Sequence, residues 1–201
     1  MLNQKEIQNI LKKQGDVRGV VFQTDASYVL KKSRQGDLLK IENLLKEWGA
    51  QFQFKDIEAM SWYPVSWRTL SLLAIKDALG WDDNQIREMG KNAPNVSIIV
   101  KLFFKLFPDI KKFAQQIPNY WKKHYTVGEL EVKEIKKEEQ IMVIHLNNFS
   151  FHPVLCQYLE GYFEQATKLT RPEDSIVTAK EIECSFRNDT PYEAYQLSWS
   201  K

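Results

Sequence analysis

The feature that most constrains the fold is a change in hydrophobic period near Gly128. Before this point, apolar residues recur three or four positions apart in several separate segments, which is typical of amphipathic helices. After it, Leu130 and Val132 alternate with charged residues, and the alternation resumes at Ile141 and Val143 beyond a charged turn. Helical segments followed by a predicted hairpin indicate an α+β fold.

The clearest element lies inside the sheet-forming half of the sequence. Residues 153–169 carry a broad apolar stripe at helical spacing, and Pro153 suits the first turn of a helix. Two further strands are predicted over 176–187 and 192–199, on either side of an Asn-Asp-Thr-Pro turn. The C-terminal part therefore predicts four strands and one long helix.

The N-terminal part predicts one strand and mostly helices. The strand covers Val17 to Thr24, which is rich in β-branched residues. The predicted helices cover residues 4–15, 38–48, 64–79, 82–90, 94–107 and 109–124. We therefore expect one α+β domain over 1–201, helix-rich at 37–125 and sheet-rich at 128–201. Its antiparallel sheet of about five strands, including the N-terminal one, packs with helices around an apolar cavity.

Composition excludes several classes of protein. The N-terminal residues lack the apolar core of a signal peptide, and Lys101 and Lys105 interrupt the longest apolar run. We therefore expect a cytoplasmic protein with no membrane span and with both cysteines reduced. The net charge is only +2 and no nucleic-acid-binding module is recognisable, so no nucleic-acid partner is expected.

No common catalytic motif is present. The sequence contains no Walker loop, GxGxxG, GxSxG, HExxH or CxxC, so no catalytic residue is assigned. Imidazole and thiolate ligands for a metal are available from His145, His152, Cys156 and Cys184. Their spacing favours a different interpretation, in which His152 caps a helix and both cysteines are structural. We therefore predict no metal site, and expect Ile182, Cys184 and Phe186 to share a buried strand face.

Aromatic residues gather where the helix 64–79 begins, and again on the segment 94–107. Such rings line pockets for apolar ligands, although they are also ordinary core material. Cys156 and Tyr162 lie on the predicted helix 153–169. The predicted ligand-binding residues are Trp62, Tyr63, Trp67, Phe103, Cys156 and Tyr162.

Two C-terminal stretches carry a resemblance to a known superfamily. The helix HPVLCQYLEGYFEQATKL and the hairpin ECSFRNDTPYEAYQLSW resemble the domains of heme-NO-binding proteins, vinyl-reductase-type sensors and transport-particle subunits. With YPVSW in the helical middle, the chain looks like an uncharacterised bacterial branch of that superfamily. The resemblance implies helices packed on an antiparallel sheet around a hydrophobic cavity, dimerisation through helices, and binding more than catalysis.

The sequence departs from two branches of this superfamily. Vinyl-reductase-type sensors carry two cysteines in the last hairpin, but here Cys184 matches the first and Ala194 lies near the second. The heme-NO-binding branch uses Tyr-x-Ser-x-Arg for the propionates, and the segment from Tyr63 to Arg68 is one residue too long. The histidines that could bind heme iron are His124, His145 and His152.

We therefore predict a non-catalytic small-molecule-binding or sensory domain for an apolar or aromatic ligand, with no cofactor. Ligand binding would order the surrounding helices and change a contact with a protein partner or within a homodimer. The alternatives are a heme-binding gas or redox sensor, and an enzyme acting on a tetrapyrrole or aromatic compound.

Overall fold

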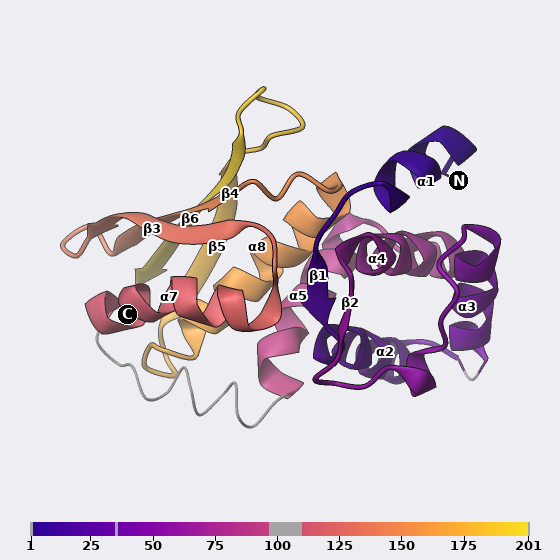
Figure 1. Ribbon diagram of the computed structural model, residues 1–201. Helices are drawn as coiled ribbons and strands as arrows, with labels where there is room; N and C mark the ends of the chain where they lie inside the picture. Colours follow the sequence, from indigo (N-terminus) through magenta and orange to yellow (C-terminus); the bar gives the residue numbers. More distant parts are fainter. Residues whose placement is uncertain (1, 35, 97–109, 201) are drawn as a thin grey trace.

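The structure is a computed structural model that describes residues 2–34, 36–96 and 110–200 (Figure 1). Helices form most of the N-terminal part, and a sheet with two flanking helices forms the C-terminal part. The helices are α1 (Gln4–Leu11), α2 (Val20–Lys32), α3 (Asp37–Glu47), η1 (Phe54–Asp56), α4 (Val65–Leu79), α5 (Asp83–Val96), α7 (Ile110–His124) and α8 (Pro153–Lys168). The strands are β1 (Asp16–Arg18), β2 (Trp62–Pro64), β3 (Glu129–Lys136), β4 (Ile141–Asn147), β5 (Ile176–Glu183) and β6 (Tyr192–Ser200).

The C-terminal strands form an antiparallel sheet in the order β3-β4-β6-β5. Along β4, one of its two inner strands, half-buried and buried residues alternate strictly, as a sheet with one face on the core requires. The predicted α+β class is confirmed. The N-terminal strand does not join this sheet, however, because β1 pairs with β2 in a separate two-stranded ribbon.

The predicted strand 17–24 is wrong beyond Arg18, because α2 begins at Val20. Gly19 makes the turn between them, and a Cβ at this position would overlap the carbonyl oxygen of Glu58. The β-branched residues that favour a strand lie instead in a helix whose Phe22 is fully buried. Tertiary packing overrides local propensity here.

Helices α5 and α8 cross in close contact. A Cβ built on Gly90 would overlap the carbonyl oxygen of Tyr158, and one built on Gly161 would overlap that of Arg87. Gly90 therefore does not end its helix, as the sequence predicted, but lets α5 continue to Val96 against α8. Most of the predicted helix 94–107 lies outside the described residues.

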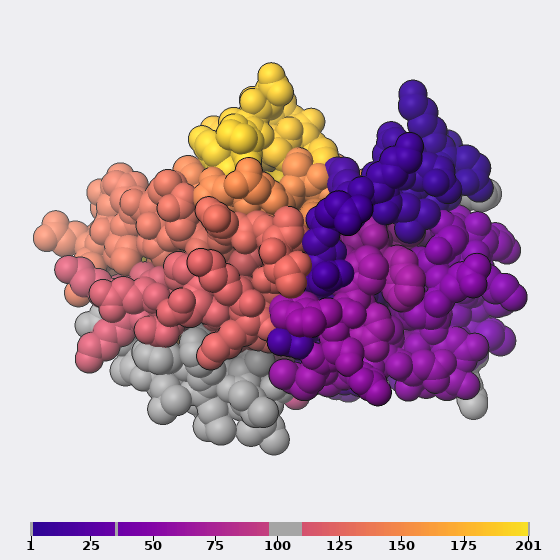
Figure 2. All heavy atoms as spheres, viewed as in Figure 1, coloured from indigo at the N-terminus to yellow at the C-terminus, as the bar shows by residue number. Residues whose placement is uncertain are grey.

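The two parts lie beside each other on the face shown in Figure 2, with the N-terminal helices on one side and the C-terminal residues on the other. Helix α7 packs against β3, and α8 lies between the sheet and α5 (Figure 1). The buried apolar side chains form one cluster that extends through both parts. No helix in the described ranges has both the length and the apolarity needed to cross a bilayer.

Candidate functional site

A cavity of about 490 Å³ lies where α7 and α8 face the sheet and the N-terminal helices. This volume is within the range of small-molecule pockets, roughly 300–1,000 Å³. Its wall is mainly apolar and aromatic, with residues from α2, α4, α7, β3, β4 and α8. The rings that line it include Phe113, Tyr120, Trp121, Tyr158, Tyr162 and Phe163.

His124, the last residue of α7, is the one histidine of the three that lines the cavity. Its Nδ1 lies 3.0 Å from the backbone oxygen of Tyr120, one helical turn earlier. Because a carbonyl oxygen can only accept, Nδ1 must carry the proton and Nε2 must carry the lone pair. Burial lowers the pKa of His124, which keeps the imidazole neutral. Within the described ranges, Nε2 has no hydrogen-bond partner and is available as a metal ligand.

A buried charged cluster forms another part of the cavity wall. The Nη1 of Arg68 donates to the Tyr125 hydroxyl at 2.7 Å, and its Nη2 lies 3.3 Å from Asp25 Oδ2. Tyr158 donates to the other oxygen of Asp25 at 2.9 Å, and the guanidinium of Arg68 lies 4.4 Å from the centre of the Tyr158 ring. Burial raises the pKa of Asp25 to about 6, although the Arg68 charge opposes this shift. In the part of the chain that the structure describes, Arg68 Nε has no hydrogen-bond partner.

Two further cations belong to the cavity wall, Arg18 and Lys123. Arg18 donates through Nε to the Lys123 carbonyl at 3.3 Å and also hydrogen-bonds the Met60 carbonyl. Its guanidinium lies 3.7 Å from the centre of the Trp62 ring, which holds it in place. Positive charge is therefore available to an acidic group of a ligand.

The predicted ligand-binding residues occupy different environments. Tyr162 lines the cavity, and its hydroxyl donates to that of Tyr120 at 3.0 Å. Trp62 is 39% exposed and covers Arg18. Tyr63 packs edge-on against Phe22, Trp67 stacks on Phe52, and Cys156 is buried beside Glu181 and Cys184. Phe103 lies outside the described residues.

The chain around the two cysteines differs from the expected arrangement in one respect. His152 caps α8 as predicted, accepting from the Val154 backbone N–H at 3.0 Å. Cys184 is buried, but Ile182 and Phe186 are 42% and 39% exposed, so the three do not share a buried face. The strand ends at Glu183, after a register shift in its pairing with β6, and this ends the regular alternation.

The sequence did not reveal the pairing of Asp25 with Arg68, and it left His124 as one of three possible iron ligands. Asp25 directly follows the segment 17–24 that was wrongly predicted as a strand, and its partner Arg68 was named only as the end of a segment one residue too long for the propionate motif. His124 was a candidate without an assigned position. Its signal in the sequence is its place at the end of the predicted helix 109–124, where a side chain can reach the backbone carbonyl four residues earlier.

No protein-family model matches the sequence, and no curated protein matches it either. Solved structures do match the fold. An H-NOX protein from S. oneidensis in its Fe(II)NO ligation state is 12% identical, with 92% of this chain and 99% of that chain covered and a TM-score of 0.66. An unliganded Fe(II) H-NOX mutant from K. algicida is 12% identical, with 92% and 97% covered and a TM-score of 0.60.

A third structure, described as "Modulating Heme Redox Potential Through Protein-Induced Porphyrin Distortion", is 11% identical, with 92% of this chain and 99% of that chain covered and a TM-score of 0.59. The chain thus has the fold of H-NOX domains, as the resemblance to heme-NO-binding proteins implies. The expectation of no cofactor is corrected, because these neighbours are described by their Fe(II) states and by heme.

Proposed function

We propose that this protein is a heme-binding sensor of a gas or redox signal, in which the cavity would hold heme and His124 would bind its iron. The observation that carries the proposal is the orientation of His124. Metal-bound histidines commonly donate their second ring N–H to a carbonyl or carboxylate, which fixes the tautomer and the ring. The bond from His124 Nδ1 to the Tyr120 carbonyl is of this kind, and it leaves Nε2 for iron.

The donor set and the cavity fit this group. The wall is apolar and rich in rings, as the macrocycle requires, and the imidazole is neutral because burial lowers the pKa of His124. The sequence has no Tyr-x-Ser-x-Arg string for the propionates. Arg18 and Lys123, both part of the wall, are the cations that we assign to that role. When bound, heme would supply an iron that takes up a diatomic gas or changes oxidation state.

Signalling would begin at α7. His124 ends this helix, which packs against β3 and also contacts β1. If α7 and His124 can adopt two positions, a ligand that binds the protein more tightly in one of them increases the population of that conformation. A protein partner or a second copy of the chain would respond to that shift.

The experiment is an absorption spectrum of protein purified from heme-supplied cells. We expect a Soret band that shifts when NO is added under reducing conditions. His124→Gly should lose the band, and added imidazole should restore it by entering the space left by the side chain. His145→Gln is the matched control, because His145 lies on β4, stacks on Tyr192 of β6 and does not line the cavity. Wild-type protein without a Soret band, or His124→Gly with an unchanged one, would contradict the proposal.

A second candidate is a sensor of an acidic apolar or aromatic molecule that binds in the same cavity. It is favoured by Arg68, which lines the cavity and whose Nε has no hydrogen-bond partner in the described part of the chain. A carboxylate is the natural partner for a buried guanidinium. Native mass spectrometry of wild-type protein and of Arg68→Lys, which keeps a positive charge beside Asp25 but removes the Nε donor, would test it: an organic adduct other than heme, lost in the variant, is the expected result.

A further inference from the structure

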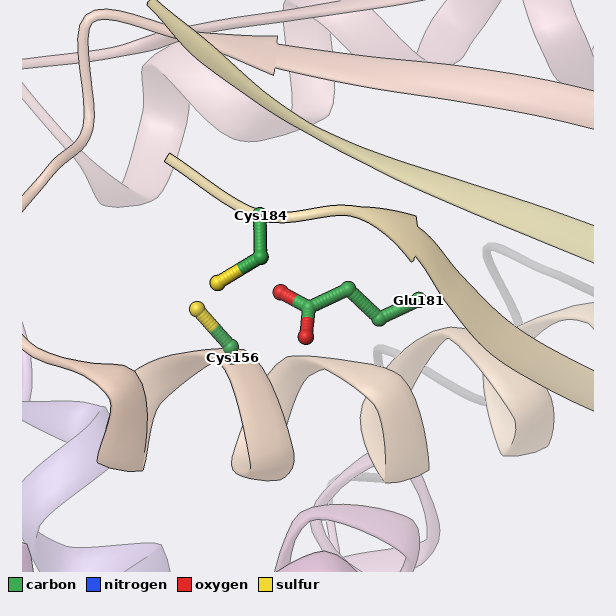
Figure 3. Close-up of side chains that lie close together, drawn as sticks. All are labelled: Cys156, Glu181 and Cys184. Atoms are coloured by element: carbon green, nitrogen blue, oxygen red, sulfur yellow. The ribbon is translucent and has the colours of Figure 1, made fainter. Parts of the chain in front are cut away.

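We propose that Cys156, Glu181 and Cys184 bind a zinc ion at the junction between α8 and the end of β5. This site lies outside the cavity and goes beyond the proposed function, because none of the three residues lines the cavity. Figure 3 shows the three side chains pointing toward one another, one from α8 and two from the C-terminal hairpin.

The distances suit a single ion. One ligand atom from each residue lies within 4.8 Å of the other two. Zinc binds thiolate sulfur at about 2.3 Å and carboxylate oxygen at about 2.1 Å, so two ligand atoms on opposite sides of one ion are at most roughly 4.6 Å apart. Small side-chain rotations would therefore bring all three groups onto a common ion.

The backbone holds these positions. The pairing of β5 with β6 changes register between Glu181 and Glu183, and this irregularity precedes the end of the strand. The turn that follows is fixed by the Cys184 N–H, which donates to Asn188 Oδ1 at 3.0 Å, and by the Cys184 carbonyl, which accepts from the Arg187 N–H at 2.9 Å. The two hairpin ligands therefore come from a constrained segment rather than from a free loop.

An unpaired buried oxygen points independently to a missing cation. The side chain of Glu181 is 4% exposed, and the group that faces its otherwise unpaired Oε1 is the thiol of Cys156, which is only a weak donor. The neighbouring Glu193 also has a buried oxygen, Oε2, without a hydrogen-bond partner among the described residues. Buried polar atoms are nearly always paired, and a carboxylate without a partner is especially unfavourable. A metal ion facing Glu181 Oε1 accounts for that atom.

The charges and the chemistry of the ligands favour zinc. Thiols bind metal ions as thiolates, so an ion at this site would displace the protons of both cysteines. Two thiolates then balance the charge of Zn²⁺, and Arg187, which pairs with Glu181 Oε2, balances the carboxylate. Sulfur ligands select zinc over magnesium or calcium. A tetrahedral ion retains one position for water or for Glu193.

The test uses the full chain, purified without a metal-affinity step, reduced, and equilibrated with Zn²⁺ before gel filtration and elemental analysis. We expect about one zinc per chain. With Co²⁺ instead, a thiolate-to-cobalt charge-transfer band should appear in the near ultraviolet. Cys156→Ser and Cys184→Ser should each lose the band. Glu183→Gln, which removes a neighbouring carboxylate outside the trio, is the matched control and should retain both signals.

Arg187→Gln keeps the test decisive if the cysteine variants fold poorly, because this side chain is 62% exposed. It should weaken zinc binding by roughly 10- to 100-fold, as the loss of a group that holds a metal ligand typically does. His124→Gly should bind as much zinc as the wild type. This result would show that the zinc site is independent of the proposed heme site. Zinc content that survives the double cysteine substitution would overturn the proposal. So would reduced protein that binds no zinc and forms only a Cys156–Cys184 disulfide on oxidation.

Discussion

Arg68 Nη2 lies 3.3 Å from Asp25 Oδ2, and neither side chain is more than 1% exposed. The pair joins α4 to α2, and Tyr158 ties α8 to the same carboxylate. Charged side chains that are buried this completely are tolerated only when each is paired with an opposite charge and makes further hydrogen bonds. The pair therefore fixes how three helices meet at the wall of the cavity.

Replacing one member of this pair should be strongly destabilising. We expect Asp25→Ala to lower the free energy of unfolding at neutral pH by about 3–5 kcal/mol, because Arg68 remains buried without its counterion. Urea unfolding followed by circular dichroism measures this loss. The control is Lys40→Ala, which breaks the exposed pair with Asp37 and should cost less than about 1 kcal/mol. Equal losses in the two variants would refute the role given to the buried pair.

Asp25 should also make stability depend on pH. Its pKa is about 6 in the folded protein, raised by burial, against about 3.9 in an unfolded chain. The folded state therefore holds this proton more tightly, so the stabilisation is fully present below pH 4 and is lost as the pH rises through 6. The loss amounts to about 3 kcal/mol.

Asp25→Asn should remove that slope. The charged and titratable groups that face Asp25 are Arg68, Tyr125 and Tyr158, and none of them changes charge in this range. The measurement is urea unfolding of both proteins between pH 4 and 8. The free energy of unfolding of the wild type minus that of Asp25→Asn should fall from pH 4 to 6 and stay level above pH 7. Parallel curves would show that Asp25 does not titrate in this window.

The helices and strands that could be predicted from the sequence are those in which the spacing of apolar residues matches the face that packs on the core. Helix α8 was expected over 153–169 and runs from Pro153 to Lys168, because its apolar stripe faces the core along its length. The strands of the β3–β4 hairpin alternate for the same reason. Helix α2 was missed because Val20 and Val21 favour a strand, and only the fold shows that Phe22 is buried on a helix.

The candidate site was harder to predict because its partners are far apart in the sequence. The side chain of Asp25 meets that of Arg68, 43 residues later, through an arrangement of helices that no local pattern encodes. Glu181 was not considered as a ligand because the hairpin around Cys184 was expected to be a regular strand. Residue types that suit the chemistry were visible in the sequence, but their proximity was not.

The close crossing of α5 and α8 predicts that Gly161 cannot accept even a methyl group. Gly161→Ala should lower the free energy of unfolding by about 1–3 kcal/mol, because the new Cβ would overlap the Arg87 carbonyl oxygen. Helix propensity alone predicts the opposite sign, a gain of about 1 kcal/mol. Urea unfolding distinguishes the two, with the exposed Lys46→Ala as a control expected within about 0.5 kcal/mol of wild type. A stabilised Gly161→Ala protein would mean that the helices are further apart.

Filling the cavity should block the ligand without unfolding the protein. Ala166 lies on α8, is buried, and faces the cavity. The indole of Ala166→Trp would enter the hollow, so the free energy of unfolding should stay equal or rise as apolar surface is buried. Heme bound per chain, from the Soret absorbance, should fall at least about tenfold, a loss of roughly 1.4 kcal/mol in binding free energy.

The matched control for this variant is Trp67→Ala. Trp67 stacks on Phe52 and does not line the cavity, so its removal should cost stability while heme uptake stays close to wild type. Displacement of a hydrophobic dye gives the same comparison without heme. Full heme uptake by folded Ala166→Trp, together with loss of uptake in Trp67→Ala, would place the ligand at the aromatic residues beside Phe52 instead of in the cavity.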